Sequence, residues 1–167
     1  MTQLPWEIAA RRAGQLAPAG PSGSRAALRG VVASLRRAAE TAPELVAGIT
    51  GLTAAAAAAS HFPVHVVDRA RWAEANAELF ATMAGDALGL DGRVQARLAA
   101  EETGVLLSVL STRVLGQFDP YIAGGRLQLV APNMVQLERQ LDLDVIDFRL
   151  WVCLHEQTHA VQFAAAP

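Results

Sequence analysis

The sequence has one cysteine, few aromatic residues and no lysine. Because Cys153 is the only cysteine, neither an internal disulfide nor a cysteine-rich zinc site can form. Aromatic residues make up 5% of the chain, so a stacking platform for nucleic-acid bases is not expected. All fourteen basic residues are arginine and the net charge is −2, which argues against a basic surface for nucleic acid.

Long apolar runs and an export signal are missing too. The longest apolar runs, Leu52–Ala59 and Val105–Leu110, are far too short to span a bilayer. Charges interrupt the N-terminal segment where a signal peptide needs its apolar core. The sequence therefore predicts a soluble, cytoplasmic protein that does not contact a membrane. With 52% hydrophobic residues, residues 1–167 are expected to fold as a single domain with a buried core.

Apolar periodicity predicts a mostly helical N-terminal half. A three-four spacing of apolar residues predicts a helix that begins after Ser24 and ends at Pro43, followed by a short helical piece at Glu44–Ile49. For Thr53–Ser60, with its six consecutive alanines, a short helix and a low-complexity spacer are equally favoured. The segment after it, from His61 to His65, is predicted to be extended because Pro63 disfavours a helix.

The second half predicts further helices and one hairpin. Asp68 is expected to cap a long helix, and another helix is predicted over Gly92–Leu115, with its apolar second half central to the core. Gly116–Ile122 and Arg126–Val130 read as the two arms of a β-hairpin, and Pro120 restricts the first arm to an edge position. Two more helices are then expected, the last beginning at Asp142 or Asp144. The predicted fold is mainly α, with one short β-hairpin before the final helix.

The final helix carries a metal-binding pattern. His155-Glu156-Gln157-Thr158-His159 is an HExxH motif, which places two imidazoles one turn apart on one helix face. Both can bind one Zn²⁺, and Glu156 can take a proton from water that the zinc activates. Phe148, Val152 and Gln162 share the histidine stripe, with the apolar residues expected to exclude water from one side. Cys153 is predicted to point away, into the core.

A catalytic zinc normally has three protein ligands, and the sequence shows only two clearly. The longer metzincin pattern is excluded because Gln162 and Ala165 stand where it needs glycine and histidine. The third ligand is therefore absent, supplied from upstream, or carried by residues beyond Pro167. Upstream candidates, each with a more ordinary reading as a surface or core residue, are His61, His65, Glu101 and Glu102.

The hairpin allows two interpretations. Arg126–Val130 could be an edge strand that holds a peptide substrate in extended form by β-augmentation. Equally, the hairpin could simply cover the core.

Long segments of the sequence resemble a known family. The segments that carry the resemblance are Thr50–Leu52, Val66–Asn76, Gly116–Tyr121, Arg126–Leu141 and Asp147–Phe163. They are similar to the zincin-like metallopeptidase type 2 family, bacterial proteins of unknown substrate that are sometimes labelled as associated with deazaflavin-cofactor biosynthesis. The resemblance implies a mostly helical zinc-peptidase-like fold, with His155 and His159 as zinc ligands and Glu156 as the catalytic carboxylate. Family members continue well past this motif, and no residue here supports the cofactor-biosynthesis label.

Together these features predict the N-terminal part of a zinc-dependent metallohydrolase that acts as a peptidase on peptides or proteins, with Glu156 as general base. Residues 1–167 alone are expected to be inactive. The alternative is a non-catalytic helical binding or scaffold protein that retains a remnant metal site. An exposed apolar patch around Val161 and Phe163 is expected to cause self-association through the C-terminal end.

Overall fold

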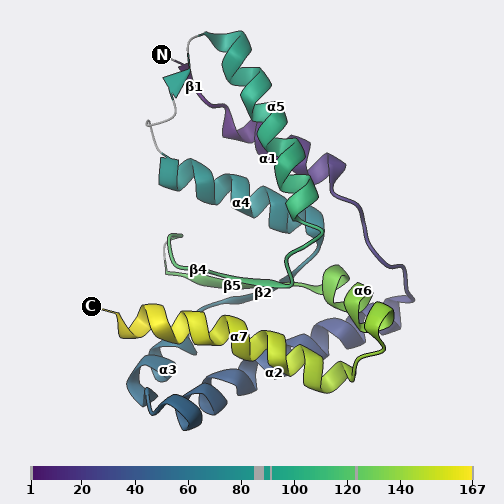
Figure 1. Cartoon of the computed structure of the whole chain (residues 1–167), viewed down its shortest axis with the longest axis vertical. Coiled ribbons are helices and arrows are strands. Elements are labelled where there is room, and N and C mark those ends of the chain that lie inside the picture. Colours follow the sequence, from purple (N-terminus) through teal and green to yellow (C-terminus); the bar gives the residue numbers. More distant parts are fainter. Residues whose placement is uncertain (1, 85–88, 91, 123, 167) are drawn as a thin grey trace. The chain divides into compact units, whose positions relative to one another are not determined.

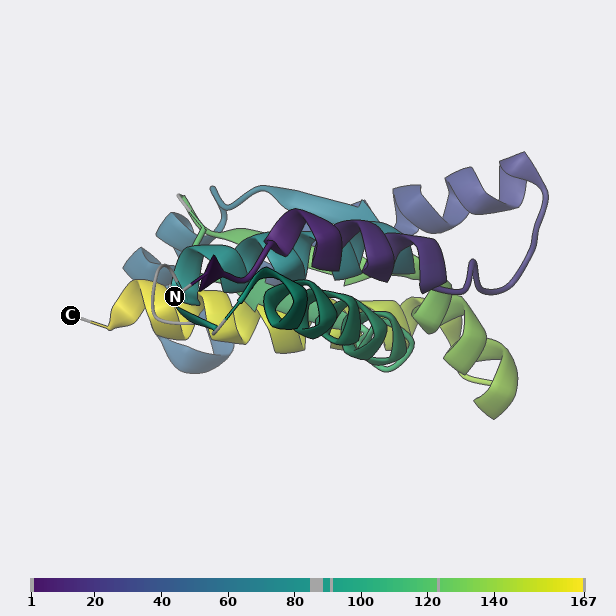
Figure 2. The ribbon, with the colours of Figure 1, turned by 90° about the horizontal axis from the view of Figure 1, so that it is seen from above.

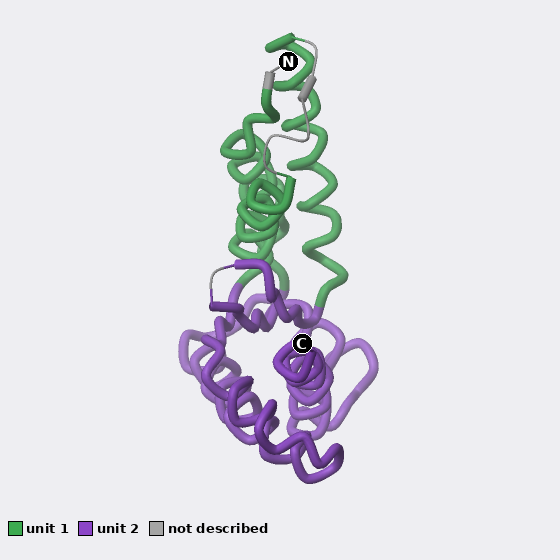
Figure 3. The backbone as a smooth tube through the Cα atoms, turned by 90° about the vertical axis from the view of Figure 1, so that its left-hand side faces the viewer, with its two compact units in different colours: residues 1–20, 68–114 green, residues 21–67, 115–167 purple. Residues whose placement is uncertain are grey.

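The computed structural model describes residues 2–84, 89–90, 92–122 and 124–166, and within them the chain is mainly helical, as predicted. The backbone forms two compact units (Figure 3). Unit 1 comprises residues 1–20 and 68–114, and unit 2 comprises residues 21–67 and 115–167. The single-domain organisation of residues 1–167 stays a prediction. In the described part of the chain, no helix is long and apolar enough to cross a membrane.

Unit 1 is built from three helices and a short strand pair. The elements are α1 (Trp6–Leu16), α4 (Arg69–Ala84) and α5 (Arg93–Leu110), with β1 (Thr2–Gln3) antiparallel to β3 (Gly89–Leu90). Helix α1 packs against both α4 and α5 (Figure 2). As predicted, Asp68 caps α4, since its Oδ1 accepts a hydrogen bond from the Arg71 N–H at 2.8 Å.

Helix α5 packs through its small residues, which contradicts the predicted role of its apolar second half. A Cβ at Gly104 would lie 2.8 Å from the Ala9 carbonyl oxygen, so only glycine permits this approach of α1. The face that α5 buries consists of Ala96, Ala100, Gly104, Leu107 and Ser108. Because this face turns inward, Val105, Leu106, Val109 and Leu110 are exposed instead of forming the core centre. The helix also ends at Leu110, before the predicted Leu115.

Unit 2 places its two longest helices on one face of a three-stranded sheet (Figure 1). Its helices are α2 (Arg25–Thr50), α3 (Thr53–Ala59), α6 (Ala131–Leu141) and α7 (Val145–Ala165). Its strands are β2 (Val64–Val67), β4 (Gly116–Asp119) and β5 (Arg126–Val130). Strand β5 is central, parallel to β2 and antiparallel to β4. Its Leu127 and Leu129 join the core cluster under α2 and α7.

The predicted hairpin is confirmed, but its strand with a free edge is β4 and not Arg126–Val130. β4 ends at Asp119, directly before Pro120, and lies at the edge of the sheet, as the proline predicted. Arg126–Val130 has β2 on one side and β4 on the other, so it cannot be the edge strand that holds a peptide. The extended segment predicted over His61–His65 is confirmed only at its end, because β2 begins at Val64, while the N–H groups of His61 and Phe62 still bond back to α3.

One helix, α2, replaces the predicted break at Pro43. It runs from Arg25 to Thr50 with Pro43 inside, and ends at Gly51, whose φ of 72° suits glycine. Proline removes one backbone hydrogen bond, but Ala42 and Val46 are buried on either side of it. Burial of the apolar face of α2 therefore outweighs the free energy lost with that hydrogen bond. After Gly51, the alanine run forms α3, which confirms the helical alternative, and Ala56 and Ala59 are buried.

Candidate metal centre

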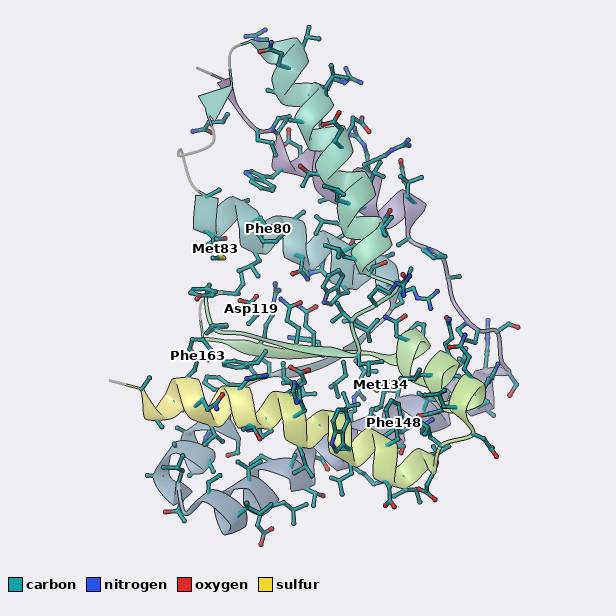
Figure 4. The ribbon with its side chains drawn as sticks, in the orientation of Figure 1. Phe80, Met83, Asp119, Met134, Phe148 and Phe163 are labelled. Carbon is teal, nitrogen blue, oxygen red and sulfur yellow. The ribbon has the colours of Figure 1, made fainter. Side chains whose placement is uncertain are left out.

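Helix α7 presents one face to the core and the histidine face to solvent. Asp144 caps its start, accepting hydrogen bonds from the N–H groups of Ile146 and Asp147, both at 2.9 Å. Met134 and Phe148 lie where α6 and α7 meet (Figure 4). Further along, Val152 is buried in the core. The remaining face is exposed and carries the two histidines of the motif.

Cys153 lies in the core, as predicted. Its side chain is fully buried, and its Sγ donates to the Leu35 carbonyl oxygen of α2 at 3.8 Å. Burial, with a smaller contribution from nearby Glu156, raises the pKa of the Cys153 thiol to about 12. Cys153 therefore faces the core beside α2 and not the two histidines.

The two imidazoles of the motif converge on each other. The Nε2 atoms of His155 and His159 lie 3.3 Å apart, and the rings are perpendicular with centroids 4.9 Å apart. Two nitrogens bound to one tetrahedral zinc at about 2.0–2.1 Å would lie about 3.3–3.4 Å apart. The spacing of the two nitrogens therefore fits a shared zinc ion. Both side chains are exposed, so a metal held between them would be open to solvent.

Each histidine also contacts a neighbour on its own helix. The Trp151 ring stacks on His155 with centroids 5.7 Å apart and planes inclined by 25°. The Nδ1 of His159 lies 3.2 Å from the Oε1 of Gln162. The sequence had suggested that Val152 lies beneath the histidines. Val152 is buried in the core instead, and Trp151 takes its place, a contact that the spacing of four residues before His155 could have indicated.

Glu156 is the buried member of the motif. Its side chain is 7% exposed and accepts a hydrogen bond from the backbone N–H of Phe118 on β4. Burial raises the pKa of Glu156 above its ordinary value, although His155, His159 and the Phe118 N–H partly oppose this. A carboxylate that is desolvated in this way is a stronger base than an exposed one.

The hydrogen-bonding pattern of the hairpin explains why Phe118 is available to Glu156. The Val130 N–H donates to the Leu115 carbonyl at 2.8 Å, which makes this pair hydrogen-bonded across the hairpin. Because such pairs alternate along antiparallel strands, the backbone groups of Gly116 and Phe118 face away from β5. Glu156 therefore meets the open edge of β4. Sequence reasoning did not find this contact, because Glu156 and Phe118 lie 38 positions apart.

Gly116 lets β4 approach Glu156 closely, so a larger residue at this position is expected to destabilise the fold. A Cβ at position 116 would lie 2.6 Å from Glu156 Cγ. We expect Gly116→Ala to lower the free energy of unfolding by about 1–3 kcal/mol, through overpacking against this carboxylate side chain. Urea unfolding followed by circular dichroism measures the change.

Gly30→Ala is the matched control for this substitution. Gly30 lies within α2, and a Cβ there would meet nothing within 4 Å. Alanine at this position should raise stability by about 0.5–1 kcal/mol, because glycine is a poor helix former. Equal effects of the two alanines would show that Gly116 is not in tight contact with Glu156.

A third ligand does not emerge near the histidine pair. Among the described residues, no group of three or more His, Cys, Asp or Glu side chains is placed to hold a metal ion. Of the upstream candidates, His61 donates from Nδ1 to the Ala57 carbonyl at 2.8 Å. Glu101 forms an ion pair with Arg12 at 3.3 Å in unit 1. His65 lies on β2, the edge strand opposite β4, and Glu102 is an exposed residue of α5.

The apolar patch expected near the end of α7 is only half present. Phe163 (labelled in Figure 4) is 50% exposed. Its ring packs on those of Phe118 and Tyr121 at centroid distances of 5.8 and 6.5 Å. Val161 is 1% exposed, which contradicts the prediction, because it points to the core side of the helix. Self-association through this end stays a prediction.

Similarity to known proteins extends over most of the chain. The chain is similar to a protein from Chloroflexus aurantiacus whose crystal structure is described as that of a candidate hydrolase with a novel fold. The two are 32% identical with a TM-score of 0.67, over 96% of this chain and 53% of the other, so this chain spans about half the length of that protein. No curated protein sequence matches the chain. The family model for zincin-like metallopeptidases matches residues 4–167, and the chain belongs to that family.

Proposed function

We propose that this chain carries the zinc-binding helix of a hydrolase that cleaves peptide bonds. The observation that carries the proposal is the convergence of two imidazole Nε2 atoms, 3.3 Å apart, beside a buried carboxylate on the same helix. The family match and the description of the similar solved structure support the hydrolase class. In this proposal His155 and His159 hold Zn²⁺, and Glu156 is the general base.

The residues of the site would divide the chemistry between them. When bound, zinc polarises a carbonyl oxygen and lowers the pKa of water. Glu156 would accept the proton from the attacking water, and burial makes its carboxylate the stronger base that this step requires. The bond from the Phe118 N–H fixes the carboxylate but leaves it further acceptor capacity for that water.

The open edge of β4 is the natural place for a peptide. An extended peptide can add to such an edge through backbone hydrogen bonds. Glu156 already takes the Phe118 N–H, so a peptide would pair with both backbone groups of Gly116 and with the Phe118 carbonyl. A peptide held there would lie beside Glu156. This arrangement supports a peptide substrate more directly than the sequence could.

Zinc analysis tests the proposal. We expect the chain to bind one zinc ion at equilibrium when zinc is supplied in excess, as measured by dialysis and elemental mass spectrometry. At a free zinc concentration about a hundred times the Kd, bound metal should add about 2.7 kcal/mol of stability, or about 5–10 °C in the unfolding temperature. Magnesium is the control, because it prefers oxygen ligands and should give no shift.

The zinc measurement distinguishes the proposed hydrolase from the alternative, a non-catalytic scaffold. A non-catalytic scaffold would show no stoichiometric zinc and no thermal shift with added metal. The same assay can include a peptide hydroxamate, a compound that chelates open zinc positions. It should bind the zinc-loaded chain more tightly than a hydroxamate without a peptide. Equal binding of the two would contradict a peptide site along β4. The inactivity of residues 1–167 alone stays a prediction.

A further inference from the structure

The two ring nitrogens of His159 have different partners. Its Nδ1 lies 3.2 Å from Gln162 Oε1, an amide oxygen that can only accept a hydrogen bond. The proton of the neutral ring must therefore be on Nδ1, which donates it to Gln162. This leaves the Nε2 of His159 with a free lone pair, directed at His155.

The proton position on His159 fixes the proton position on His155. The two Nε2 atoms lie 3.3 Å apart, a distance at which a hydrogen bond requires one of them to carry a proton. Because His159 Nε2 has none, a hydrogen bond between the two rings in the metal-free chain would need the neutral His155 ring to carry its proton on Nε2. This contact therefore predicts opposite tautomers for the two histidines in the metal-free chain.

The two histidines therefore differ in how ready they are to bind a metal. A metal needs a lone pair on each Nε2 atom, and metal-binding histidines donate their other ring N–H to an acceptor that orients them. His159 already meets both conditions through Gln162. His155 must move its proton from Nε2 to Nδ1, while the stacked Trp151 keeps its ring in place.

We propose that Gln162 is a positioning residue of the metal centre, which holds His159 in the Nδ1–H tautomer and so presets one ligand before the metal arrives. The inference rests on the proposed zinc site but concerns a residue outside the HExxH motif. Gln162 follows His159 by three positions, where side chains on one helix face meet. It acts only through His159 and does not touch the metal.

Nitrogen-15 NMR of the imidazole rings in the metal-free chain tests the tautomers directly. At alkaline pH, where an ordinary imidazole is neutral, we expect His159 to show the Nδ1–H pattern and His155 the Nε2–H pattern. On addition of zinc, only His155 should change tautomer. In Gln162→Ala, His159 should lose its Nδ1–H preference, and in Gln162→Glu, which keeps an acceptor, it should retain it. Identical His159 spectra in the wild type and Gln162→Ala would overturn the inference.

Zinc affinity provides the second measurement. Loss of the acceptor should weaken zinc binding about tenfold in Gln162→Ala, the lower end of the range for groups that orient metal-bound histidines, and Gln162→Glu should restore it. Gln95→Ala, at an exposed glutamine of α5, is the control and should leave zinc affinity unchanged. Unchanged affinity in Gln162→Ala would refute the positioning role while the zinc site stands. A wild type that binds no zinc would instead refute the zinc site, and the metal-free spectra would still decide the role of Gln162.

Discussion

Replacing either His155 or His159 with alanine is expected to lower zinc affinity at least a hundredfold. The two Nε2 atoms lie 3.3 Å apart, a spacing that fits two nitrogen ligands of one zinc ion. Removing one leaves a single nitrogen ligand, which does not hold zinc against water. Competition with a chromophoric chelator measures the affinity of each variant.

Glu156→Gln is the matched control for the histidine variants. Glutamine keeps the size of the side chain, and its amide oxygen can still accept from the Phe118 N–H. Because Glu156 is expected to contact water and not the metal, zinc affinity should stay within a few-fold of the wild type. Equal losses in all three variants would contradict the division into two ligands and one base. Equal zinc affinities in all three variants would show that the zinc site does not lie on this helix.

Breaking the buried ion pair between α6 and α7 is expected to cost about 3–5 kcal/mol of unfolding free energy. Arg149 donates from Nε and Nη2 to the two carboxylate oxygens of Glu138, at 2.7 and 2.8 Å, and both residues are buried. Arg149→Met leaves the Glu138 carboxylate buried without its partner, and desolvation then opposes folding. Arg149 lies six positions before His155, so the ion pair holds the first half of α7 against α6. Urea unfolding of the metal-free chain measures the loss.

Two further variants identify the cause. The double variant Arg149→Met with Glu138→Leu removes both charges and should recover stability to within about 1 kcal/mol of the wild type. Arg139→Met removes an exposed arginine from the same helix α6 and should cost less than about 1 kcal/mol. If the double variant is as unstable as Arg149→Met, the loss comes from packing of the arginine stem and not from an unpaired buried charge.

Local sequence determined the elements of the site. The four-residue spacing of His155 and His159 places both on one face of a helix, and Asp144 begins that helix by capping it. The hairpin before it followed from its glycines and from Pro120. Each of these features depends on residues a few positions apart, whose relative placement is dictated by the repeat of a helix or strand.

Only the tertiary structure decided the environment of those elements. The sequence predicted that Pro43 would end a helix, but burial of the apolar face of α2 carries the helix through it to Thr50. It predicted a core role for the second half of α5, but the small-residue face packs inward. Both outcomes depend on which surfaces meet, and burial against a distant element outweighs local propensity.

Glu156 shows most clearly which properties come from local sequence and which come from tertiary structure. The motif alone placed this residue between two histidines. Its raised pKa depends on burial, and its hydrogen bond depends on an outward-facing N–H of β4 that Gly116 allows to come close. Desolvation and contact between distant residues are properties of the packed chain. The sequence therefore determined which groups stand on the helix, and the tertiary structure determined how basic and how well held the carboxylate is, because only packing removes water from it.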